Sequence, residues 1–240
     1  MILRPITWIA LCVLLVSGEG MATTILSQDR GTFARSYVVA SPEFREDIQT
    51  SEIRSFDDFD AISTSTAQLS PMVATSSASL ESTLGTETMQ AQGSAASTLV
   101  ISEGDRLAET PADSFFEVLF DIQRERPYQL QGRVDSTTFE GAEGFASVEL
   151  SYFGLFPIVD HAAGGTNFSV FDESGILAVG RYRLTGFALT QGEVSGNVSS
   201  PAAQASFELN LTLPEPTTQT AAAFSLLVLA GLARARRRPA

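Results

Sequence analysis

The sequence predicts an all-β protein built as a two-sheet antiparallel sandwich, with an apolar helix expected at each end of the chain. Short runs in which apolar and polar residues alternate recur about every dozen residues, and no convincing amphipathic helix lies between them. The final run is the clearest, with apolar residues at the alternating positions Ala205, Phe207, Leu209, Leu211 and Leu213. Side chains two residues apart share one face of a strand, so this run has one buried and one solvated face.

The first 22 residues have the organisation of a secretory signal peptide. Arg4 provides the positive start, residues 6–16 form the apolar core, and Gly20-Met21-Ala22 matches the small-x-small pattern that precedes a cleavage site. We therefore expect cleavage between Ala22 and Thr23, with the secretion translocase as a partner. An uncleaved anchor is the alternative, although the apolar core is too short for a spanning helix.

Residues 23–55 are predicted to be a partly ordered N-terminal extension, and residues 56–213 to be the sandwich domain. Within the extension, residues 32–40 favour one strand, whereas the charged residues 42–53 show no clear period. From Phe56 the chain is rich in serine, threonine and alanine, a composition that is also compatible with disorder. Frequent threonine, sparse proline and recurring turn glycines favour strands with small side chains instead.

The strand signal is strongest after Ser114. Residues 116–122 alternate strictly, and a turn at 124–127 is followed by alternation over 128–134, which predicts a hairpin between the two runs. Further strands are expected over 146–152, 168–170, 176–179 and from Tyr182 onward. The segment Ser174–Leu184 resembles a glycine–tyrosine hairpin of jelly-roll accessory domains in secreted proteins. This resemblance implies a jelly-roll-like sandwich.

The charge and the cysteine content exclude several classes of function. The chain has 15 basic residues, all arginine, 28 acidic residues and a net charge of −13. Without the predicted signal peptide and the C-terminal arginines, 10 basic and 27 acidic residues remain, a charge of about −17 that repels nucleic acid and anionic lipid. The only cysteine, Cys12, lies in the predicted signal, so the mature domain is expected to lack disulfides. A chain without lysine has neither a P-loop nor a Schiff-base site.

Few residues indicate catalysis or metal binding. His161 is the single histidine, and without a Gly-x-Ser-x-Gly elbow we expect a solvated loop residue. A glycosidase needs two carboxylates that face each other, and no pattern here singles out such a pair. Calcium suits oxygen ligands, and its candidate ligands are Asp57, Asp58 and Asp60, or Asp172-Glu173, although solvated acidic loops are the simpler explanation. We predict that the protein is not an enzyme and needs no cofactor, and keep a secreted hydrolase as an alternative.

A carbohydrate-binding surface is the main alternative for the domain. Exposed aromatic rings on a sandwich face can stack on sugar rings, and neighbouring arginines can donate hydrogen bonds. The residues that fit this pattern are Tyr152, Phe156, Tyr182, Arg181 and Arg183, with Phe153 beside them. The competing hypothesis places these rings in the core, where aromatic residues of strands are usually found.

The last 27 residues combine three features in a fixed order: the tripeptide Pro214-Glu215-Pro216, an apolar run over 221–233, and the arginines Arg234, Arg236, Arg237 and Arg238. The apolar run has 13 residues, fewer than the roughly 20 that a helix needs to cross about 30 Å of hydrocarbon. The arginines place the C-terminus on the cytoplasmic side by the positive-inside rule. A terminal helix packed on the domain is the alternative, but such a helix needs a polar face.

This arrangement resembles the PEP-CTERM sorting signal of exported bacterial proteins. The resemblance implies transient retention in the inner membrane, recognition of Pro214-Glu215-Pro216, and removal of the tail by an exosortase-type enzyme. It also implies a final location at the cell surface or in the extracellular matrix of bacteria that produce exopolysaccharide. We therefore predict a secreted, surface- or matrix-associated, non-enzymatic sandwich protein, with an exopolysaccharide-binding module as the alternative.

Overall fold

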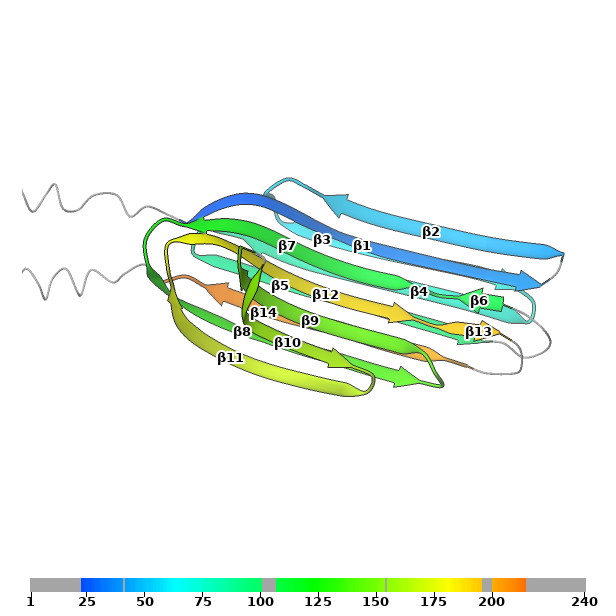
Figure 1. The fold of residues 1–240 in the computed structure, drawn as a ribbon. Helices are drawn as coiled ribbons and strands as arrows, with labels where there is room; N and C mark the ends of the chain where they lie inside the picture. Colours follow the sequence, from blue (N-terminus) through cyan, green and yellow to red (C-terminus); the bar gives the residue numbers. More distant parts are fainter. Residues whose placement is uncertain (1–22, 41, 101–106, 154, 196–199, 215–240) are drawn as a thin grey trace, which may run out of the picture.

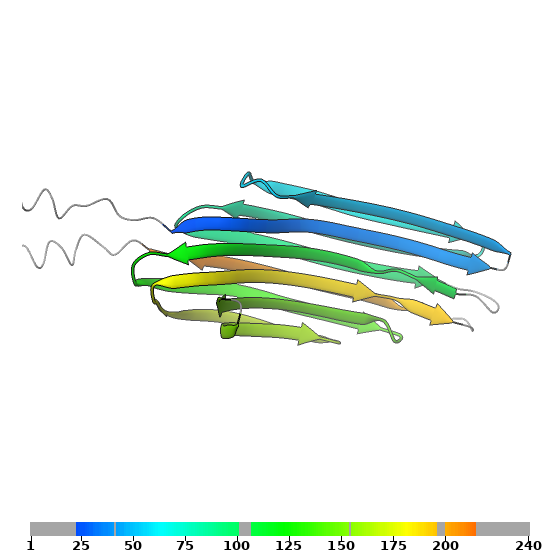
Figure 2. The ribbon, with the colours of Figure 1, turned by 45° about the horizontal axis from the view of Figure 1, so that its top comes forward.

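The computed structural model describes residues 23–40, 42–100, 107–153, 155–195 and 200–214. Over these residues the chain is all β, and two antiparallel sheets lie face to face in an elongated sandwich (Figure 1; Figure 2). This confirms the predicted all-β, two-sheet antiparallel class. No helix in the described part is long and apolar enough to cross a membrane. The two predicted flanking helices lie outside the described residues.

Sheet A has the strand order β10–β9–β12–β7–β1–β2. The strands are β10 (Phe156–Gly164), β9 (Glu143–Tyr152), β12 (Gly180–Gln191), β7 (Ala112–Ile122), β1 (Thr24–Ala40) and β2 (Glu43–Ile53). Two three-residue strands, β6 (Leu107–Glu109) and β13 (Glu193–Ser195), continue the lines of β7 and β12 beyond short breaks, since β6 pairs with both β1 and β13.

Sheet B has the strand order β11–β8–β14–β5–β4–β3. Its strands are β11 (Asn167–Leu177), β8 (Arg126–Phe139), β14 (Ala202–Thr212), β5 (Thr88–Val100), β4 (Met72–Leu84) and β3 (Phe59–Leu69). The serine- and threonine-rich stretch therefore forms β3, β4 and β5, as the interpretation in favour of strands predicted.

The strands from β5 to β14 form one nested set of antiparallel pairs. The hairpin β9–β10 is innermost; outward from it β8 pairs with β11, β7 with β12, β6 with β13 and β5 with β14. The chain thus forms a long double-stranded ribbon that folds back and forth between the two sheets. The strands β1 and β2 extend sheet A beyond this ribbon, and β3 and β4 extend sheet B.

The larger core cluster is apolar and aromatic, because the inward positions of β7, β12 and β14 carry large side chains. Phe116, Phe120 and Phe207 are almost completely buried. The ring of Phe207 occupies the space opposite two glycines, since a Cβ at Gly93 or Gly186 would lie 2.3 or 2.4 Å from it. Glycine at these two positions therefore makes room for a full aromatic ring between the sheets.

A second part of the interior is built from hydroxyl groups, and it lies between β1, β3 and β4. The buried side chains of Ser36, Ser65 and Ser76 bond one another, with Oγ–Oγ distances of 2.8 Å for Ser36–Ser65 and for Ser65–Ser76. Ser76 also donates to the carbonyl of Arg35 at 2.8 Å. Thr32 and Ser63 form a further buried pair at 2.8 Å. These contacts satisfy polar groups that would otherwise be costly to bury.

Side chains close both open sides of the sandwich. At one side, Asp47 and Gln49 of β2 accept hydrogen bonds from the backbone N–H groups of Thr66 and Thr64 on the edge strand β3, at 2.9 and 3.3 Å. At the other side, the imidazole of His161 on β10 stacks on Phe171 of β11, with ring centroids 4.4 Å apart. The bonds from Asp47 and Gln49 occupy backbone groups of an edge strand that would otherwise be free to pair with another chain.

The structure differs from the predicted local arrangement at three places. The runs over 116–122 and 128–134 belong to β7 in sheet A and β8 in sheet B, so they are not a hairpin. The segment Ser174–Leu184 likewise passes from β11 in sheet B to β12 in sheet A. Alternation shows which side of a strand is buried, but both sheets bury one side, so the pattern does not distinguish a hairpin from a crossover.

The third difference concerns residues 23–55, which were expected to precede the sandwich. They form β1 and β2, and β1 lies in the interior of sheet A, where it pairs with both β7 and β2. This stretch is part of the folded unit because β1 contributes buried residues such as Ala34 and Val38 to the space between the sheets. The charged strand β2 is almost entirely exposed, which explains why it shows no period.

Candidate functional site

The aromatic surface predicted for sugar binding is only partly assembled. Tyr182 is 2% exposed; its ring stacks on Phe120 with a centroid distance of 5.8 Å, and its hydroxyl donates to the carbonyl of Ala178 at 2.9 Å. Burial raises the pKa of the Tyr182 phenol, and the neighbouring Tyr152 adds to that shift. Tyr182 is therefore a core residue and offers no ring face to a ligand.

Tyr152 and Phe156 are exposed, and they lie beside the turn between β9 and β10. Together with four other exposed side chains they form a surface that we call the apolar end patch: Tyr152, Phe153, Leu155, Phe156, Ile158 and Val179. Phe153 has a positive φ of 56°, and its N–H donates to the carbonyl of Arg181 at 2.7 Å. Gly180 allows the ring of Tyr152 to lie against the backbone, since a Cβ there would be 2.5 Å from that ring.

The two arginines predicted to assist a sugar site are engaged by carboxylates. Arg181 donates from Nε to Asp121 at 3.1 Å, and its guanidinium lies 5.8 Å from the ring centroid of Phe153. Arg183 lies between Glu117 and Glu149, at 3.8 and 4.0 Å. These contacts orient the guanidinium groups along the sheet and balance the charge beside the apolar end patch.

Among the acidic residues considered for calcium, Asp57 and Asp172 accept hydrogen bonds from other groups of the protein. The carbonyl of Asp57 accepts a hydrogen bond from the fully buried Arg30 at 2.5 Å, and its carboxylate accepts one from Ser55 at 2.8 Å. Burial lowers the pKa of Arg30, and the charges of Asp58 and Asp57 offset part of that shift. Asp60 lies on β3 and faces sheet B's outer surface. In the described ranges, no group of three or more His, Cys, Asp or Glu side chains is placed to hold a metal.

His161 has a hydroxyl and a carboxylate beside it. Its Nδ1 lies 3.5 Å from Ser169 Oγ, and its Nε2 lies 3.5 Å from a carboxylate oxygen of Glu173. Both distances are at the long limit for a hydrogen bond. Neither of the two surface depressions described below includes any of these three side chains. The imidazole instead packs on Phe171, so the structure gives this group a role in joining β10 to β11.

One depression in the described part was not identified from the sequence. It is an open groove of about 710 Å³ on the outer face of sheet B, and we call it the polar groove. Its lining side chains come from five strands: Asp60, Ile62, Ser79, Glu81, Gln92, Ser94, Arg133, Asp135, Ser206 and Glu208. A smaller depression of about 300 Å³ lies near the β8–β9 turn, beside Thr138 and Phe145.

Strand register arranges the polar groove in two rows across the sheet. One row runs from Asp60 through Glu81, Gln92 and Glu208 to Arg133. The neighbouring row has three serines, Ser79, Ser94 and Ser206, between Ile62 at one end and Asp135 at the other. The three hydroxyls therefore lie beside a row of three carboxylates, an amide and an arginine. The lining residues occupy the polar positions of each strand's alternation, a signal that the sequence contains, but the order of strands was needed to bring them together.

Internal hydrogen bonds fix several groove side chains. Gln92 donates to Glu81 at 2.8 Å, and Ser79 and Ser94 share a hydrogen bond of 2.8 Å. Arg133 contacts Asp135 at 2.5 Å, and its guanidinium lies 5.6 Å from the ring centroid of Phe168, which is 64% exposed. The groove therefore offers hydroxyls, carboxylates, an amide and an arginine, with one aromatic ring at its flank.

The described fold begins and ends at one place. Arg126, which is buried, donates to Thr23 Oγ1 at 2.7 Å and to the carbonyl of Leu213 at 2.6 Å. Thr23 is the first residue after the predicted signal peptide, and Leu213 immediately precedes the exposed Pro214. Figure 1 shows β1 beginning and β14 ending at the same end of the sandwich, which we call the exit end. The remaining residues of the predicted cleavage site and sorting tail lie outside the described part: Ala22, Glu215, Pro216, Arg234, Arg236, Arg237 and Arg238.

Comparison with protein-family models and with curated proteins gave no match. Among solved structures, the chain is similar to the enzymatically active domain of bacteriophage CBA120 tailspike protein 4, with a TM-score of 0.21 and 11% identity over 57% of this chain and 19% of that one. It is also similar to a structure of infectious bursal disease virus, Gt strain, with a TM-score of 0.27 and 10% identity over 80% of this chain and 57% of that one. For the Gx strain of this virus, the TM-score is 0.26 and the identity 11%, over 82% of this chain and 57% of that one. The chain thus spans about a fifth of the tailspike domain and little over half of the viral chains. These TM-scores support no inference about function.

Proposed function

We propose that this chain is an exported, non-enzymatic jelly-roll protein that a signal peptide and a PEP-CTERM-type tail deliver to the cell surface or the extracellular matrix. The observation that carries the proposal is the clamp of Arg126 on Thr23 and Leu213. Both predicted processing segments join the folded unit at this clamp. Removal of either segment at its predicted boundary leaves every described strand intact.

The jelly-roll part of the proposal is supported by the nested pairing from β5–β14 inward to β9–β10, which has the connectivity of a rolled-up double hairpin. Such a fold needs neither disulfides nor a metal, since its core is large and its sheets are broad. This suits a domain without cysteine in an exported setting.

The proposed partners follow from the two segments. The secretion translocase and an exosortase-type processing enzyme act on them, and the tail holds the protein in the inner membrane until it is removed. The acidic surface makes nucleic acid an unsuitable partner. No cofactor is part of this proposal.

Intact mass and cell fractionation test the sorting function. The native protein should lack both ends and leave the inner membrane, while a variant with Pro214→Ala, Glu215→Ala and Pro216→Ala should stay in that membrane with its tail attached. A matched control with Thr217→Ala, Thr218→Ala and Gln219→Ala should behave like the native protein. If the tripeptide variant lost its tail and fractionated like the native protein, the sorting proposal would be wrong.

A second candidate function, binding of a neutral polysaccharide, is favoured by the polar groove. Sugar hydroxyls can donate to its carboxylates and accept from Arg133 and Gln92, and Phe168 provides an exposed ring beside them. The charged lining side chains are four carboxylates and one arginine, so a polysaccharide without charge fits better than an anionic one. The groove replaces the predicted surface around Tyr182 as the place where such binding is proposed.

Affinity electrophoresis of the native protein in gels that contain dextran, a β-glucan or a galactomannan tests this binding. Retardation by one of these polymers should weaken about tenfold in Phe168→Ala, since a stacking contact of about 1.4 kcal/mol corresponds to that factor. The control is Phe44→Ala, which removes an exposed aromatic ring on β2 of the other sheet, outside the groove. Equal retardation of both variants would exclude the groove as the binding site.

A further inference from the structure

The exit end of the sandwich carries an exposed apolar surface that neither the sorting function nor the polar groove uses. Each of the six side chains of the apolar end patch is at least 40% exposed, and Leu155 and Phe156 reach 70% and 65%. Monomeric soluble proteins rarely expose contiguous groups of large apolar side chains, and such groups mark surfaces for proteins or membranes. We therefore expect another molecule to cover the apolar end patch.

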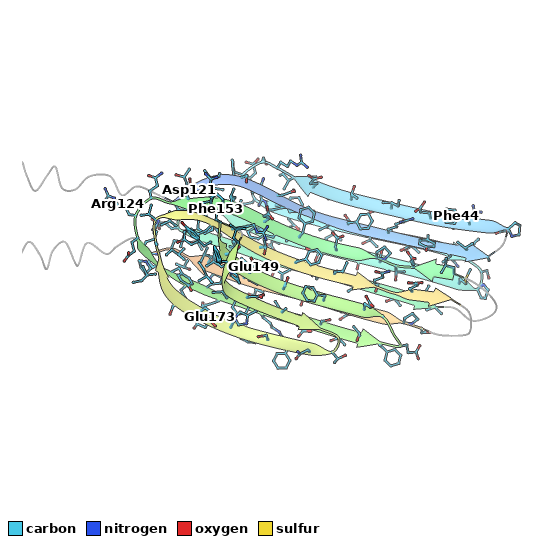
Figure 3. The ribbon with its side chains drawn as sticks, in the orientation of Figure 1. Phe44, Asp121, Arg124, Glu149, Phe153 and Glu173 are labelled. Atoms are coloured by element: carbon cyan, nitrogen blue, oxygen red, sulfur yellow. The ribbon has the colours of Figure 1, made fainter. Side chains whose placement is uncertain are left out.

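Strand register fixes the position of the patch relative to the chain ends. Tyr152 on β9 pairs with Tyr182, which pairs with Phe120, which pairs with Ile25 near the start of β1. The patch thus lies at the level where β1 begins, three strands away in the same sheet. In Figure 3, Phe153 is labelled near Asp121 and Arg124 at the exit end, while Phe44 marks the opposite end.

The tail limits how far the exit end can stand from a membrane. Seven residues, 214–220, separate Leu213 from the start of the apolar run at Ala221. A fully extended chain spans at most about 3.6 Å per residue, so this linker reaches no farther than about 25 Å. When the apolar run is inserted, the exit end and its patch are held close to the lipid surface.

The chemistry of the patch suits that surface. Aromatic side chains with aliphatic neighbours are favoured at the membrane–water interface, where one part of the ring system is apolar and the surroundings are wet. The domain as a whole is strongly acidic, but the carboxylates of Asp121, Glu117 and Glu149 beside the patch each lie within 4.0 Å of an arginine. This pairing reduces the repulsion that an anionic lipid surface exerts on this face.

We propose that the apolar end patch lies in the interface of the membrane that holds the tail, so that the sandwich stands on the bilayer by its exit end until the tail is removed. This inference rests on the proposed function, because the inserted tail brings the patch to the lipid. It adds a second contact to an apolar run that is short for a spanning helix. It also gives the exposed rings a role that ends on release, when the patch leaves the bilayer.

Fluorescence quenching by lipid tests the contact directly. The only tryptophan in the chain is Trp8, so Trp8→Phe gives a background without tryptophan in which a single reporter can be placed. Two full-length variants on this background carry Phe156→Trp, within the patch, or Phe44→Trp, at the far end. Both are bound to phosphatidylcholine vesicles with brominated acyl chains, and flotation measures binding of the whole chain.

Chains that float, with fluorescence lost at position 156 and retained at position 44, would support the inference. Chains that float without loss at position 156 would overturn it and leave the sorting function standing. Chains that do not float would contradict membrane retention by the tail and therefore both proposals. A blue shift at position 156 that grows with protein concentration in the absence of vesicles would show that a second copy covers the patch, which also overturns the inference.

Discussion

The interior of the sandwich contains two regions that bury side chains of opposite character. Between β7, β12 and β14 the inward positions are large and apolar, with Phe116, Phe120 and Phe207 fully buried. Between β1, β3 and β4 the inward positions include Ser36, Ser65 and Ser76, which are equally buried. In the aromatic region, large rings fill the space between the sheets. In the serine region, hydroxyl groups that form hydrogen bonds with one another fill it.

The difference shows two ways to stabilise the same two-sheet architecture. Burial of a large apolar side chain contributes about 1.5–3 kcal/mol by itself. A buried hydroxyl pair contributes about 1 kcal/mol, and its larger effect is the cost of leaving one member without a partner. The aromatic region should therefore supply most of the stability, and the serine region should be sensitive to loss of a single partner. Three substitution experiments test this comparison, in order of expected effect.

The largest effect is expected from Phe207→Ala in the aromatic region. The ring fills the space opposite Gly93 and Gly186, and neither glycine has a side chain that can move into the cavity. We expect the free energy of unfolding to fall by about 3–5 kcal/mol, measured by urea denaturation. The control Phe44→Ala removes an exposed ring and should cost less than about 1 kcal/mol. Similar losses in the two variants would contradict the role given to the aromatic region.

A smaller effect is expected from Ser65→Ala, which leaves Ser36 and Ser76 each without one partner. The expected loss is about 1–3 kcal/mol. The triple variant Ser36→Ala, Ser65→Ala, Ser76→Ala also removes the donor to the Arg35 carbonyl, so it should cost about 1 kcal/mol more than the single one but less than three separate losses. The control Ser79→Ala, on the outer face of sheet B, should change stability by about 0.5 kcal/mol at most. Additive losses in the triple variant would show that the hydroxyls do not act as one group.

The smallest effect concerns alkaline pH and Tyr37, which follows Ser36 on β1. Burial, together with Glu109, raises the pKa of Tyr37 to about 12, against about 10 in an unfolded chain. Its contribution to stability is therefore complete below pH 10 and is lost as the pH rises from about 10 to 12, because only the unfolded chain ionises readily there. Tyr37→Phe should reduce this loss, measured by urea denaturation at pH 9, 10 and 11. An unchanged slope would show that Tyr37 does not titrate as the structure indicates. Burial also raises the pKa values of Tyr128 and Tyr182, so part of the alkaline loss should remain.

The candidate sites show which features of a binding surface the alternation within single strands can predict. Arg133 and Glu208 each stand at a polar position of a strand whose alternation predicts a solvated face, and Gln92 occupies such a position in β5. The sequence did not show that β5, β14 and β8 are neighbours in one sheet, because these strands are far apart in the chain. The polar groove exists only once these three strands lie side by side. Tyr182 shows the converse, since its exposure depends on the rings of Phe120 and Tyr152 from other strands.

The sequence alone determined where many strands lie and which of their faces is buried, because the two-residue period is a property of the local backbone. It also determined that the chain after Cys12 has no cysteine and is strongly acidic. Only the tertiary structure decided which sheet each strand joins, since a hairpin and a crossover bury the same alternate positions. It alone placed β2, whose exposed residues are ordered by pairing with β1 and by the bonds of Asp47 and Gln49 to β3. It also brought Thr23 and Leu213 to one arginine, because contacts between distant residues depend on how the whole chain packs.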